Sequence, residues 1–344
     1  MPEITVVVPV YKAEQFLAEC VESILSQTFS DFEVILVEDG SPDSSGAICD
    51  AYAAKYEHVS VIHQENRGQA AARNHAMKYA KGRWICFVDS DDLIHPQMLE
   101  HLHRAAEEHG AAISMCDMLE AENLPDGFLA DRDISFTQLT MDEETLTALY
   151  DADDYPAWVA CAKLIRRDLI EGYPFREGRV YEDNEAVCRW VCEGKVLAKS
   201  REELYFYRGN PDSTTKSEFR LKRLDYLWAL ESIIGFYTSL GFSEMRRRFV
   251  GRYLGAVVAC CEGARYLLNR PDVVKQIEKQ TRRFLRREQI KPEKEQFEAM
   301  LEVMHPELMR FYWPVSGAFR TLREQGISGL LKKLRSRSGR GEDQ

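Results

Sequence analysis

The sequence predicts an α/β fold, with a mostly parallel sheet flanked by helices and followed by a helical C-terminal region. Over about the first 115 residues, short β-branched and aromatic runs alternate with helical patterns, which is typical of a parallel sheet with helices on both faces. From about residue 218 onward, the apolar residues recur with a helical period throughout. The length of 344 residues predicts two domains.

The first strand is expected over residues 4–10 (ITVVVPV), where β-branched residues in succession indicate burial on both faces of the sheet. A helical pattern follows over 14–26. The second strand, 33–38, ends in a turn of Gly, Ser, Pro and Asp that also favours the start of a helix. The later strands are expected at 59–63, 84–88 and 112–116, and the later helices at 45–56, from about 68, and at 96–109.

The segments that follow are less uniform. Residues 119–145 are acidic and without a clear period, which predicts a mobile loop region. Composition and period change near residue 217, so we expect a domain boundary there. The remainder, 218–344, is then an α-helical domain that ends in a basic tail.

The net charge of −11 is unevenly distributed along the chain. Residues 1–240 hold 23 Lys and Arg against 43 Asp and Glu, whereas residues 241–344 hold 22 against 13. Such basic helices can be a solvated surface, bind an anionic membrane surface, bind nucleic acid or mediate self-association into a homo-oligomer. The acidic bulk of the chain argues against nucleic acid as a partner.

Cysteine usage and hydropathy indicate the compartment. The nine cysteines are scattered without a C-x-x-C pair, which favours free thiols in a reducing cytoplasm over disulfides or a metal site. No apolar run reaches the roughly 18 residues of a membrane-spanning helix. The apolar N-terminus lacks the basic region and cleavage site of a signal peptide. We therefore expect a cytoplasmic protein. A peripheral position on the inner face of the cell membrane is the second expectation, because of the basic C-terminal helices.

Polar residues follow the expected strands at the points where they end. In an open parallel sheet, ligands bind beyond these carboxyl ends. The residues there are Tyr11 after the first strand, Asp39 after the second, Asn66, Arg67 and Arg73 after the third, and Asp89 to Asp92 after the fourth. The sheet thus delivers an aromatic ring, several carboxylates and two arginines to one edge.

The acidic turn after the fourth strand is the strongest single signal. Asp89, Asp91 and Asp92 would repel one another at neutral pH, and a divalent cation removes that repulsion. Carboxylate oxygens suit Mg²⁺ or Mn²⁺. The alternative is an Asp-rich turn that caps the helix beginning near Pro96. His95 either completes the metal shell or simply precedes this helix.

Four segments together resemble the nucleotide-binding half of family 2 glycosyltransferases, enzymes that build bacterial polysaccharides and other cell-envelope glycans. They are VVVPVYKAE, VEDGSPDSS, NRGQAAARN and FVDSDD, in this order and at these spacings. The resemblance is closest over about residues 1–115 and weaker over 155–217. It implies a GT-A (Rossmann-like) glycosyltransferase domain over 1–217, with a nucleotide-binding half (1–115) and an acceptor half (116–217).

The resemblance implies roles for individual residues of the nucleotide-binding half. Asp39 would accept from the ring N–H of a uracil base, and Glu14 would lie close to the nucleotide. The family often has Asp-Asp where this chain has Glu38-Asp39, which leaves Asp39 in place. The other residues implied to contact the nucleotide are Pro9, Val10 and Tyr11 at the uracil, Asn66, Arg67 and Arg73 lining the pocket, and Asp89 and Ser90 near the ribose.

The same resemblance implies that the acidic turn is the D-x-D motif of the family. Asp91, together with Asp89, would hold the metal that bridges the donor diphosphate. Asp92 would contact the donor or acceptor sugar.

In the acceptor half, Glu182 and Asp183 resemble the motif whose aspartate is the catalytic base. An inverting transfer needs a carboxylate that takes the proton of the acceptor hydroxyl, and Asp183 is the expected base with Glu182 beside it. The alternative is that this acidic stretch only caps the helix beginning near Glu185. Lys163 is either a substrate contact or a solvated lysine.

Arg208 and the following segment resemble the part of the family that closes over the diphosphate. A guanidinium complements two phosphate oxygens, so Arg208 is expected to contact phosphate. Ser213, Thr214 and Thr215 would belong to the same closing segment. The alternative for Arg208 is a surface arginine in a flexible loop.

These expectations combine into a metal-dependent, inverting glycosyltransferase that uses a nucleoside diphosphate sugar, with UDP favoured, and a glycan or lipid-linked acceptor. A nucleotidyltransferase is the nearest rival enzyme, but it would need a Gly-rich basic loop after the first strand, where VYKAEQF has no glycine. A non-catalytic nucleotide-sugar-binding relative would be expected to have lost Asp91 or Asp183.

Overall fold

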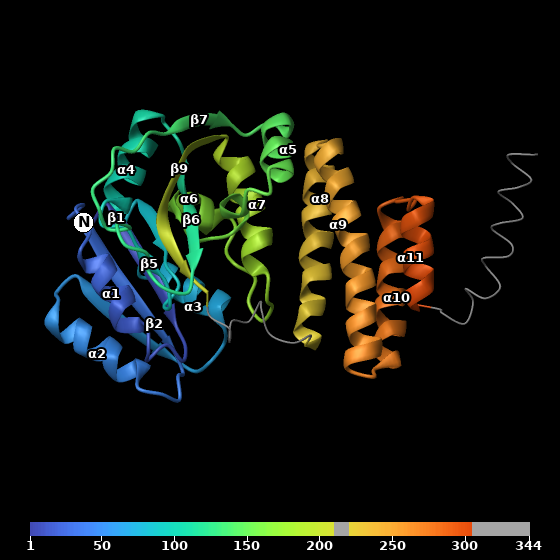
Figure 1. Ribbon diagram of the computed structural model, residues 1–344, viewed down its shortest axis with the longest axis horizontal. Helices are drawn as coiled ribbons and strands as arrows, with labels where there is room; N and C mark the ends of the chain where they lie inside the picture. The colour runs from blue at the N-terminus through green and yellow to red at the C-terminus, as the bar shows by residue number, and fades with distance from the viewer. Residues whose placement is uncertain (210–219, 305–344) are drawn as a thin grey trace, which may run out of the picture. The chain divides into compact units, whose positions relative to one another are not determined.

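The computed structural model describes residues 1–209 and 220–304, and these residues form one mixed sheet followed by helices (Figure 1). The sheet order is β3-β2-β1-β4-β8-β6-β9-β5, and β7 also pairs with β9. The strands are β1 (Ile4–Val10), β2 (Phe32–Asp39), β3 (Val59–Gln64), β4 (Trp84–Phe87), β5 (Leu93–Ile94), β6 (Ile113–Ala121), β7 (Thr137–Thr140), β8 (Lys163–Arg166) and β9 (Val196–Arg208).

The predicted parallel arrangement is found in the first half of the sheet. β1 pairs in parallel with both β2 and β4, and β2 pairs in parallel with β3. β8 then enters antiparallel to β4 and to β6, whereas β6 and β9 pair in parallel. The sheet as a whole is therefore mixed, because the second half of the chain adds strands of both directions.

The helices of the first 240 residues are α1 (Leu17–Leu25), α2 (Ser45–Lys55), α3 (Gln69–Met77), α4 (Met98–Glu108), α5 (Glu143–Asp151), α6 (Arg167–Gly172), α7 (Glu182–Gly194) and α8 (Asp225–Leu240), with short 3-10 turns η1 (Tyr155–Trp158) and η2 (Leu221–Leu224). Helices α1 to α4 follow the predicted positions to within a few residues, whereas no helix was predicted at α5 or α6.

Helices cover both faces of the sheet, as the continuous apolar runs of β1 and β2 require. One face carries Val6 and Val8, which share a buried cluster with Cys20 of α1 and Leu102 of α4. The opposite face carries Phe87, whose ring contacts Trp190 of α7 with 6.5 Å between centroids. The strands are thus buried on both sides, and their carboxyl ends are left for ligands.

The region predicted to be a mobile loop contains regular structure. β6 continues through Ala121, β7 occupies Thr137–Thr140, and α5 begins at Glu143. The prediction was wrong for these segments because pairing with β9 orders β7 and the end of β6 despite their polar composition.

The C-terminal region is helical throughout its described part, as predicted. It continues with α9 (Ser243–Glu262), the π-helical turn η3 (Gly263–Leu267), α10 (Pro271–Arg287) and α11 (Lys294–Met304). The chain separates into two compact units after Val250, beyond the boundary expected near residue 217. The reason is that α8 packs against α7 and so belongs to the first unit.

Within the described residues, no helix is both long enough and apolar enough to cross a membrane. All nine cysteines lie in this part of the chain and are free thiols. The basic tail and the segment with Ser213, Thr214 and Thr215 lie outside the described residues.

Candidate active site

The loops that follow β1 and β2 are tied to each other by hydrogen bonds. Ser44 donates to a Glu14 carboxylate oxygen through its amide (3.1 Å) and its hydroxyl (2.6 Å). The amide of Ala13 donates to the Ser45 hydroxyl at 2.9 Å. Glu14 thus supports the start of α2. At the end of β1, Pro9 and Val10 are buried, while the Tyr11 ring is 45% exposed beyond the sheet edge.

Asp39, at the end of β2, organises the next loop. Its carboxylate accepts from the backbone amides of Arg67 and Gly68, both at 2.8 Å, and from the Gln64 side chain at 2.7 Å. Gly40 follows with a φ of +66°, and a Cβ there would lie 2.8 Å from the backbone nitrogen of Asn66. The turn therefore needs glycine so that the loop carrying Asn66 and Arg67 can approach Asp39.

Asn66 and Arg67 are exposed at this edge. The Arg67 guanidinium pairs with Glu177 at 2.6 Å. Asn74 of α3 donates to the backbone oxygen of Phe175 at 2.7 Å and accepts from its amide at 3.1 Å. The loop after β3 and helix α3 are thus connected to the segment that precedes α7.

The three aspartates after β4 have different surroundings. Asp89 accepts from Arg73 at 2.9 Å and from the Gln69 side chain at 2.8 Å. Asp91 is half-buried, and Ser90 is at the limit of burial with 9% exposure. Asp89 and Asp91 are thus both half-buried, and Asp89 is held by Arg73.

Asp92 is a buried structural residue, which differs from its expected role at a sugar. It is 1% exposed, and its two oxygens accept from the Tyr205 hydroxyl (2.7 Å) and the Arg208 amide (2.9 Å). Burial and the charges of Asp89 and Asp91 raise its pKa well above the usual range. Asp92 therefore joins the acidic turn to β9, and we assign it this role in place of a sugar contact.

Arg73 connects the two halves of the site. It is 2% exposed, and its guanidinium contacts Asp89 on one side and Glu182, at 3.3 Å, on the other. The rings of Phe87 and Phe175 lie 5.8 and 5.2 Å from the guanidinium carbon. Because the side chain is enclosed in this way, we assign Arg73 a bridging role in place of the expected contact with nucleotide.

Glu182 and Asp183 begin α7, directly after Tyr181, which has a φ of +65°. Burial, together with the charge of Asp183, raises the pKa of Glu182 to about 7 against the opposing effect of Arg73. Burial also raises the pKa of the half-buried Asp183. The Glu182 carboxylate contacts Arg73, while Asp183 accepts from the amide of Asn184 at 2.8 Å. Only Asp183 therefore binds a backbone amide at the start of the helix, and the alternative that the whole acidic stretch serves as a helix cap does not account for Glu182.

Arg208 ends β9 and lies against the acidic turn. Its Nε donates to the backbone oxygen of Asp91 at 3.0 Å, and its Nη2 donates to Glu19 at 2.6 Å. The side chain is only 15% exposed. Arg208 is therefore held at the D-x-D motif, and the alternative of a surface arginine in a flexible loop is wrong.

Comparisons with known proteins identify the family of this fold and site. Residues 5–173 match the family described as "Glycosyl transferase family 2". A curated relative, Glycosyltransferase GlyG of Streptococcus pneumoniae, is 32% identical over 261 residues, which cover 72% of this chain and 85% of the relative. The chain belongs to glycosyl transferase family 2.

Solved structures support the GT-A type of fold for this glycosyltransferase. The crystal structure of S. aureus TarS residues 1–349 with UDP-GlcNAc superposes with a TM-score of 0.64 at 19% identity, over 90% of this chain and 92% of that one. Mannosyltransferase PcManGT from Pyrobaculum calidifontis, in complex with GDP-Man and Mn²⁺, gives a TM-score of 0.50 at 14% identity, over 89% and 88% of the two chains.

The sequence did not indicate the buried structural role of Lys163, which was expected to be a substrate contact or a solvated lysine. Lys163 is fully buried, and its ammonium donates to the backbone oxygens of Pro156, Val159 (2.8 Å) and Cys161 (3.3 Å). Burial lowers its pKa to about 8. Both expectations for Lys163, a substrate contact and a solvated lysine, are wrong. A lysine inside the apolar run CAKLI was the available signal.

Tyr155 is a second residue that the sequence did not indicate. Its ring is 53% exposed. Burial of part of the side chain, with the negative charges of Asp183 and Asp89 nearby, raises the pKa of its hydroxyl. Tyr155 therefore lies within electrostatic reach of both carboxylate groups of the site, on a segment fixed by Lys163.

The residues after β4 fit a divalent cation. Asp89 and Asp91 offer hard oxygen ligands, and Mg²⁺ or Mn²⁺ is typically held by one or two carboxylates together with substrate phosphates. Asp89 also pairs with Arg73, so a cation held there would share this carboxylate with the guanidinium. His95 is fully buried, accepts from the Gln97 amide and contacts the backbone oxygen of Ala130, so it precedes the helix and has no part in the metal shell.

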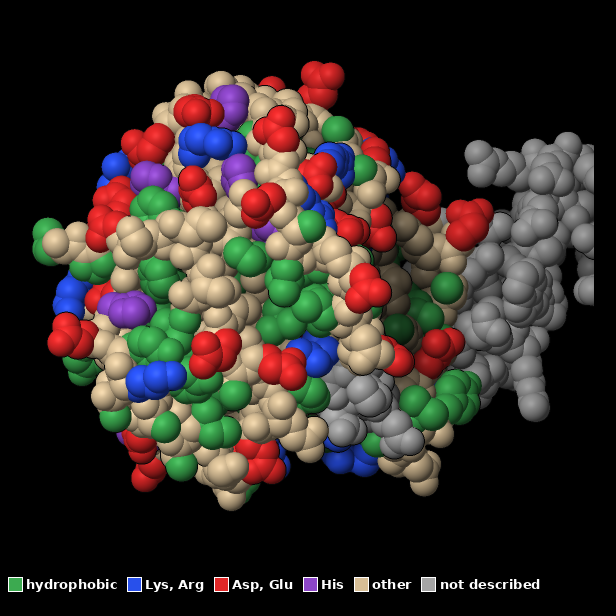
Figure 2. All heavy atoms as spheres, turned by 60° about the vertical axis from the view of Figure 1, so that its left-hand side comes forward, with side chains coloured by type: hydrophobic (Ala, Val, Ile, Leu, Met, Phe, Trp, Pro, Cys, Tyr) green, Lys and Arg blue, Asp and Glu red, His purple; other side chains and the backbone are tan. Residues whose placement is uncertain are grey.

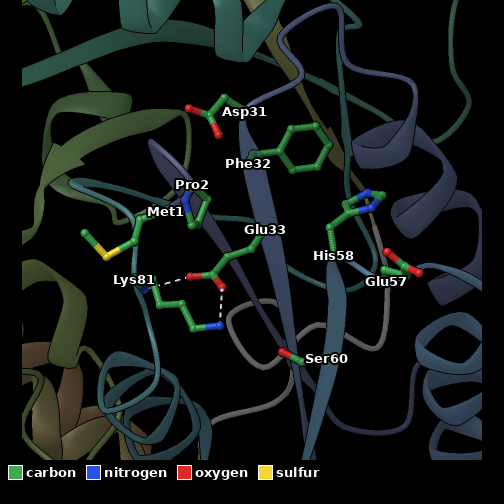
Figure 3. Close-up of a pocket in the computed structure, with 9 residues that line it drawn as sticks. All are labelled: Met1, Pro2, Asp31, Phe32, Glu33, Glu57, His58, Ser60 and Lys81. Carbon is green, nitrogen blue, oxygen red and sulfur yellow. Dashed lines mark hydrogen bonds and ion pairs between the residues drawn. The ribbon is translucent and has the colours of Figure 1, made fainter.

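Two other features lie away from this edge, at the amino ends of the parallel strands. Glu3, His103 and Glu107 bring three possible ligand atoms together, but Arg83 pairs with both glutamates. A hollow of about 370 Å³ (Figure 3) is bordered by the residues that begin β1 to β3 and by the Glu33–Lys81 pair. Neither feature adjoins the acidic turn.

Glu182 gives the fold a predictable pH dependence. Its pKa in the folded protein, about 7, is above the ordinary value of 4.5, so its stabilising contribution is fully present below about pH 4.5 and is lost as the pH rises through about 7. We expect the free energy of unfolding of the native protein to fall by about 2–3 kcal/mol relative to Glu182→Gln across this range. Urea unfolding of both proteins from pH 4.5 to 8 measures it.

The control for this prediction is Glu108→Gln, which changes an exposed carboxylate of α4, away from Arg73. Its difference from the native protein should stay nearly constant with pH. A constant difference for Glu182→Gln as well would contradict the burial of its charge.

Proposed function

We propose that this glycosyltransferase transfers a sugar from a UDP-sugar to a hydroxyl of a glycan or lipid-linked acceptor, with a divalent metal and with inversion at the anomeric carbon. The observation that carries the proposal is the chain of contacts Asp89–Arg73–Glu182. It sets the D-x-D turn beside the carboxylates that begin α7. One group of carboxylates can then serve the donor diphosphate while the other serves the acceptor.

The donor end is formed by the edge residues of β1 and β2 and by the D-x-D turn. We assign Pro9, Val10, Tyr11 and Asp39 to the uracil. The exposed side chains Asn66 and Arg67 border the same pocket. The TarS structure named above contains UDP-GlcNAc, a second TarS structure contains UDP, and PcManGT contains GDP-Man and Mn²⁺. These ligands support a nucleoside diphosphate sugar as donor and a divalent metal. We propose UDP as the nucleotide because both TarS structures contain it.

Asp183 is the proposed catalytic base. Its raised pKa makes the carboxylate a stronger proton acceptor than an exposed aspartate. In the proposed step, Asp183 takes the proton of the acceptor hydroxyl while that oxygen bonds to the anomeric carbon and the bond to the diphosphate breaks. A metal held by Asp91 and Asp89 would stabilise the charge on the leaving diphosphate. A single displacement through an oxocarbenium-like state inverts the anomeric centre.

Helix α10 provides a basis for the proposed contact with the inner membrane surface. Val273, Ile277 and Phe284 form its buried side, while its basic residues are exposed. These are Lys275, Lys279, Arg282, Arg283, Arg286 and Arg287. An exposed basic stripe is attracted to anionic lipid by about 1 kcal/mol for each Lys or Arg near the surface.

Calorimetric titration of UDP, with and without Mn²⁺, tests the donor site. We expect micromolar binding that requires the metal and weakens at least tenfold in Asp91→Asn, because that change removes a ligand charge without changing its size. Asp126→Asn, which neutralises an exposed carboxylate elsewhere, should bind as the native protein does. Absence of UDP binding in both conditions would exclude a UDP donor and favour another nucleotide or a non-catalytic relative.

Hydrolysis of a panel of UDP-sugars tests the proposed base. Once the panel identifies a donor, Asp183→Asn should reduce kcat about 10²–10⁴-fold, the range for loss of a general base, and should leave the Kd for UDP within about twofold. Asp168→Asn, at an exposed carboxylate paired with Arg166, is the matched control. Full activity of Asp183→Asn would assign the base to another residue.

Sedimentation with vesicles tests the membrane proposal. We expect binding to phosphatidylcholine vesicles with 30% phosphatidylglycerol but not to phosphatidylcholine alone, and at least a tenfold loss in Lys279→Glu/Arg283→Glu, since two attractive charges become repulsive. Lys55→Glu/Lys78→Glu makes the same change at exposed lysines of the first unit and should still bind. Equal binding of both double variants would leave α10 as a solvated surface.

A further inference from the structure

The catalytic carboxylates are preceded by a segment without helix or strand. Residues 176–181, here called the strap, connect the end of the acceptor-side loop to α7. The last strap residue, Tyr181, has a left-handed backbone (φ +65°) and is followed directly by Glu182 and Asp183. A non-glycine residue in this conformation costs about 1–3 kcal/mol and persists only where the surroundings hold it.

Helix α8 provides that hold through Asp225, its first residue. One Asp225 oxygen pairs with the Arg179 guanidinium at 2.8 Å, and the other accepts from the backbone amide of Val180 at 3.3 Å. The carboxylate is 20% exposed, so solvent screens the pair only partly. A single side chain of α8 thus fixes both the backbone and a side chain of the strap.

Two aromatic residues of the same helix extend the contact. The Trp228 ring is approached by the guanidinium carbons of Arg176 and Arg179, at 5.0 and 4.9 Å from its centroid. The ring of Tyr226 lies 4.8 Å from that of Tyr181, centroid to centroid. The residue with the strained backbone is therefore packed against α8.

A second set of contacts joins α8 to the body of α7, which lies beside it in Figure 1. The Ser232 hydroxyl donates to the buried carboxylate of Glu185. Arg189 of α7 lies over the Phe236 ring with 4.5 Å to its centroid. These contacts hold the body of α7 in place. The strap contacts then determine the position of its first turn, which carries Glu182 and Asp183.

We propose that Asp225 is a positioning residue for transfer, holding the strap so that Asp183 meets the acceptor hydroxyl; this rests on the proposed role of Asp183 as base. Helix α8 lies beyond the segment 5–173 that matches the family and makes its contacts within the first compact unit. Helix α8 is thus proposed to belong to the acceptor side of the site. Misplacement of a reacting group by about 1 Å can cost as much as 10²-fold in rate.

The test compares Asp225→Ala and Asp225→Glu with Asp272→Ala. The control residue lies in the first turn of α10 and pairs with Arg270 at 2.6 Å, as Asp225 pairs with Arg179. Hydrogen–deuterium exchange of residues 176–184 is measured without ligand, UDP affinity by calorimetry with Mn²⁺, and kcat and KM by hydrolysis of the UDP-sugar that the panel identifies.

We expect Asp225→Ala to exchange faster over 176–184 and to lose at least tenfold in kcat, with the UDP Kd within about twofold. Asp225→Glu should recover part of both, and Asp272→Ala should match the native protein. Unchanged exchange in Asp225→Ala would overturn the proposal, as would an equal loss of UDP affinity and kcat. The hydrogen–deuterium exchange measurement needs no substrate, so it tests the hold of Asp225 on the strap even where the donor assignment fails. An active Asp183→Asn variant would instead refute the proposed role of Asp183 as the base.

Discussion

The buried guanidinium of Arg73 is the interaction on which the rest of the site depends. Burying a charge is costly unless it is paired and hydrogen-bonded, and Arg73 meets this condition only because Asp89 and Glu182 lie on either side of it. The three residues come from α3, the turn after β4 and the start of α7. Displacing any one of these elements removes at least one ion pair of the buried guanidinium, so their relative positions are held by electrostatics as well as by packing.

This arrangement gives neighbouring carboxylates of one acidic site different surroundings. Asp92 is buried and accepts from Tyr205 and the Arg208 amide, whereas Asp89 and Asp91 are half-buried and Asp89 pairs with Arg73. Acidic side chains are also spread over the face of the molecule shown in Figure 2. Charge alone therefore does not define the site, whereas the partners of each carboxylate do.

The sequence predicted β1 to β4, the start of β6, helices α1 to α4 and the carboxylate edge, because burial on both faces gives continuous apolar runs and the polar motifs follow the strand ends. It did not predict β5, β7, β8 or β9. It could not predict the partners. Arg73 and Glu182 are 109 residues apart, and three neighbouring aspartates look alike until Tyr205 of β9 is placed beside one of them. The boundary near residue 217 was misplaced relative to the compact units because the helical period of α8 does not show that α8 packs on α7.

The position of Glu182 and Asp183 relative to the family match has a physical consequence. The matched segment, residues 5–173, contains the D-x-D turn and Arg73 but ends before both carboxylates of α7. Under the proposed function, the donor side lies within the common segment, while the acceptor side is formed by α7, the strap and α8. Two ion pairs cross this division, Arg73–Glu182 and Arg67–Glu177, so a change in the shape of α7 or of the strap must keep a carboxylate opposite each of these guanidinium groups.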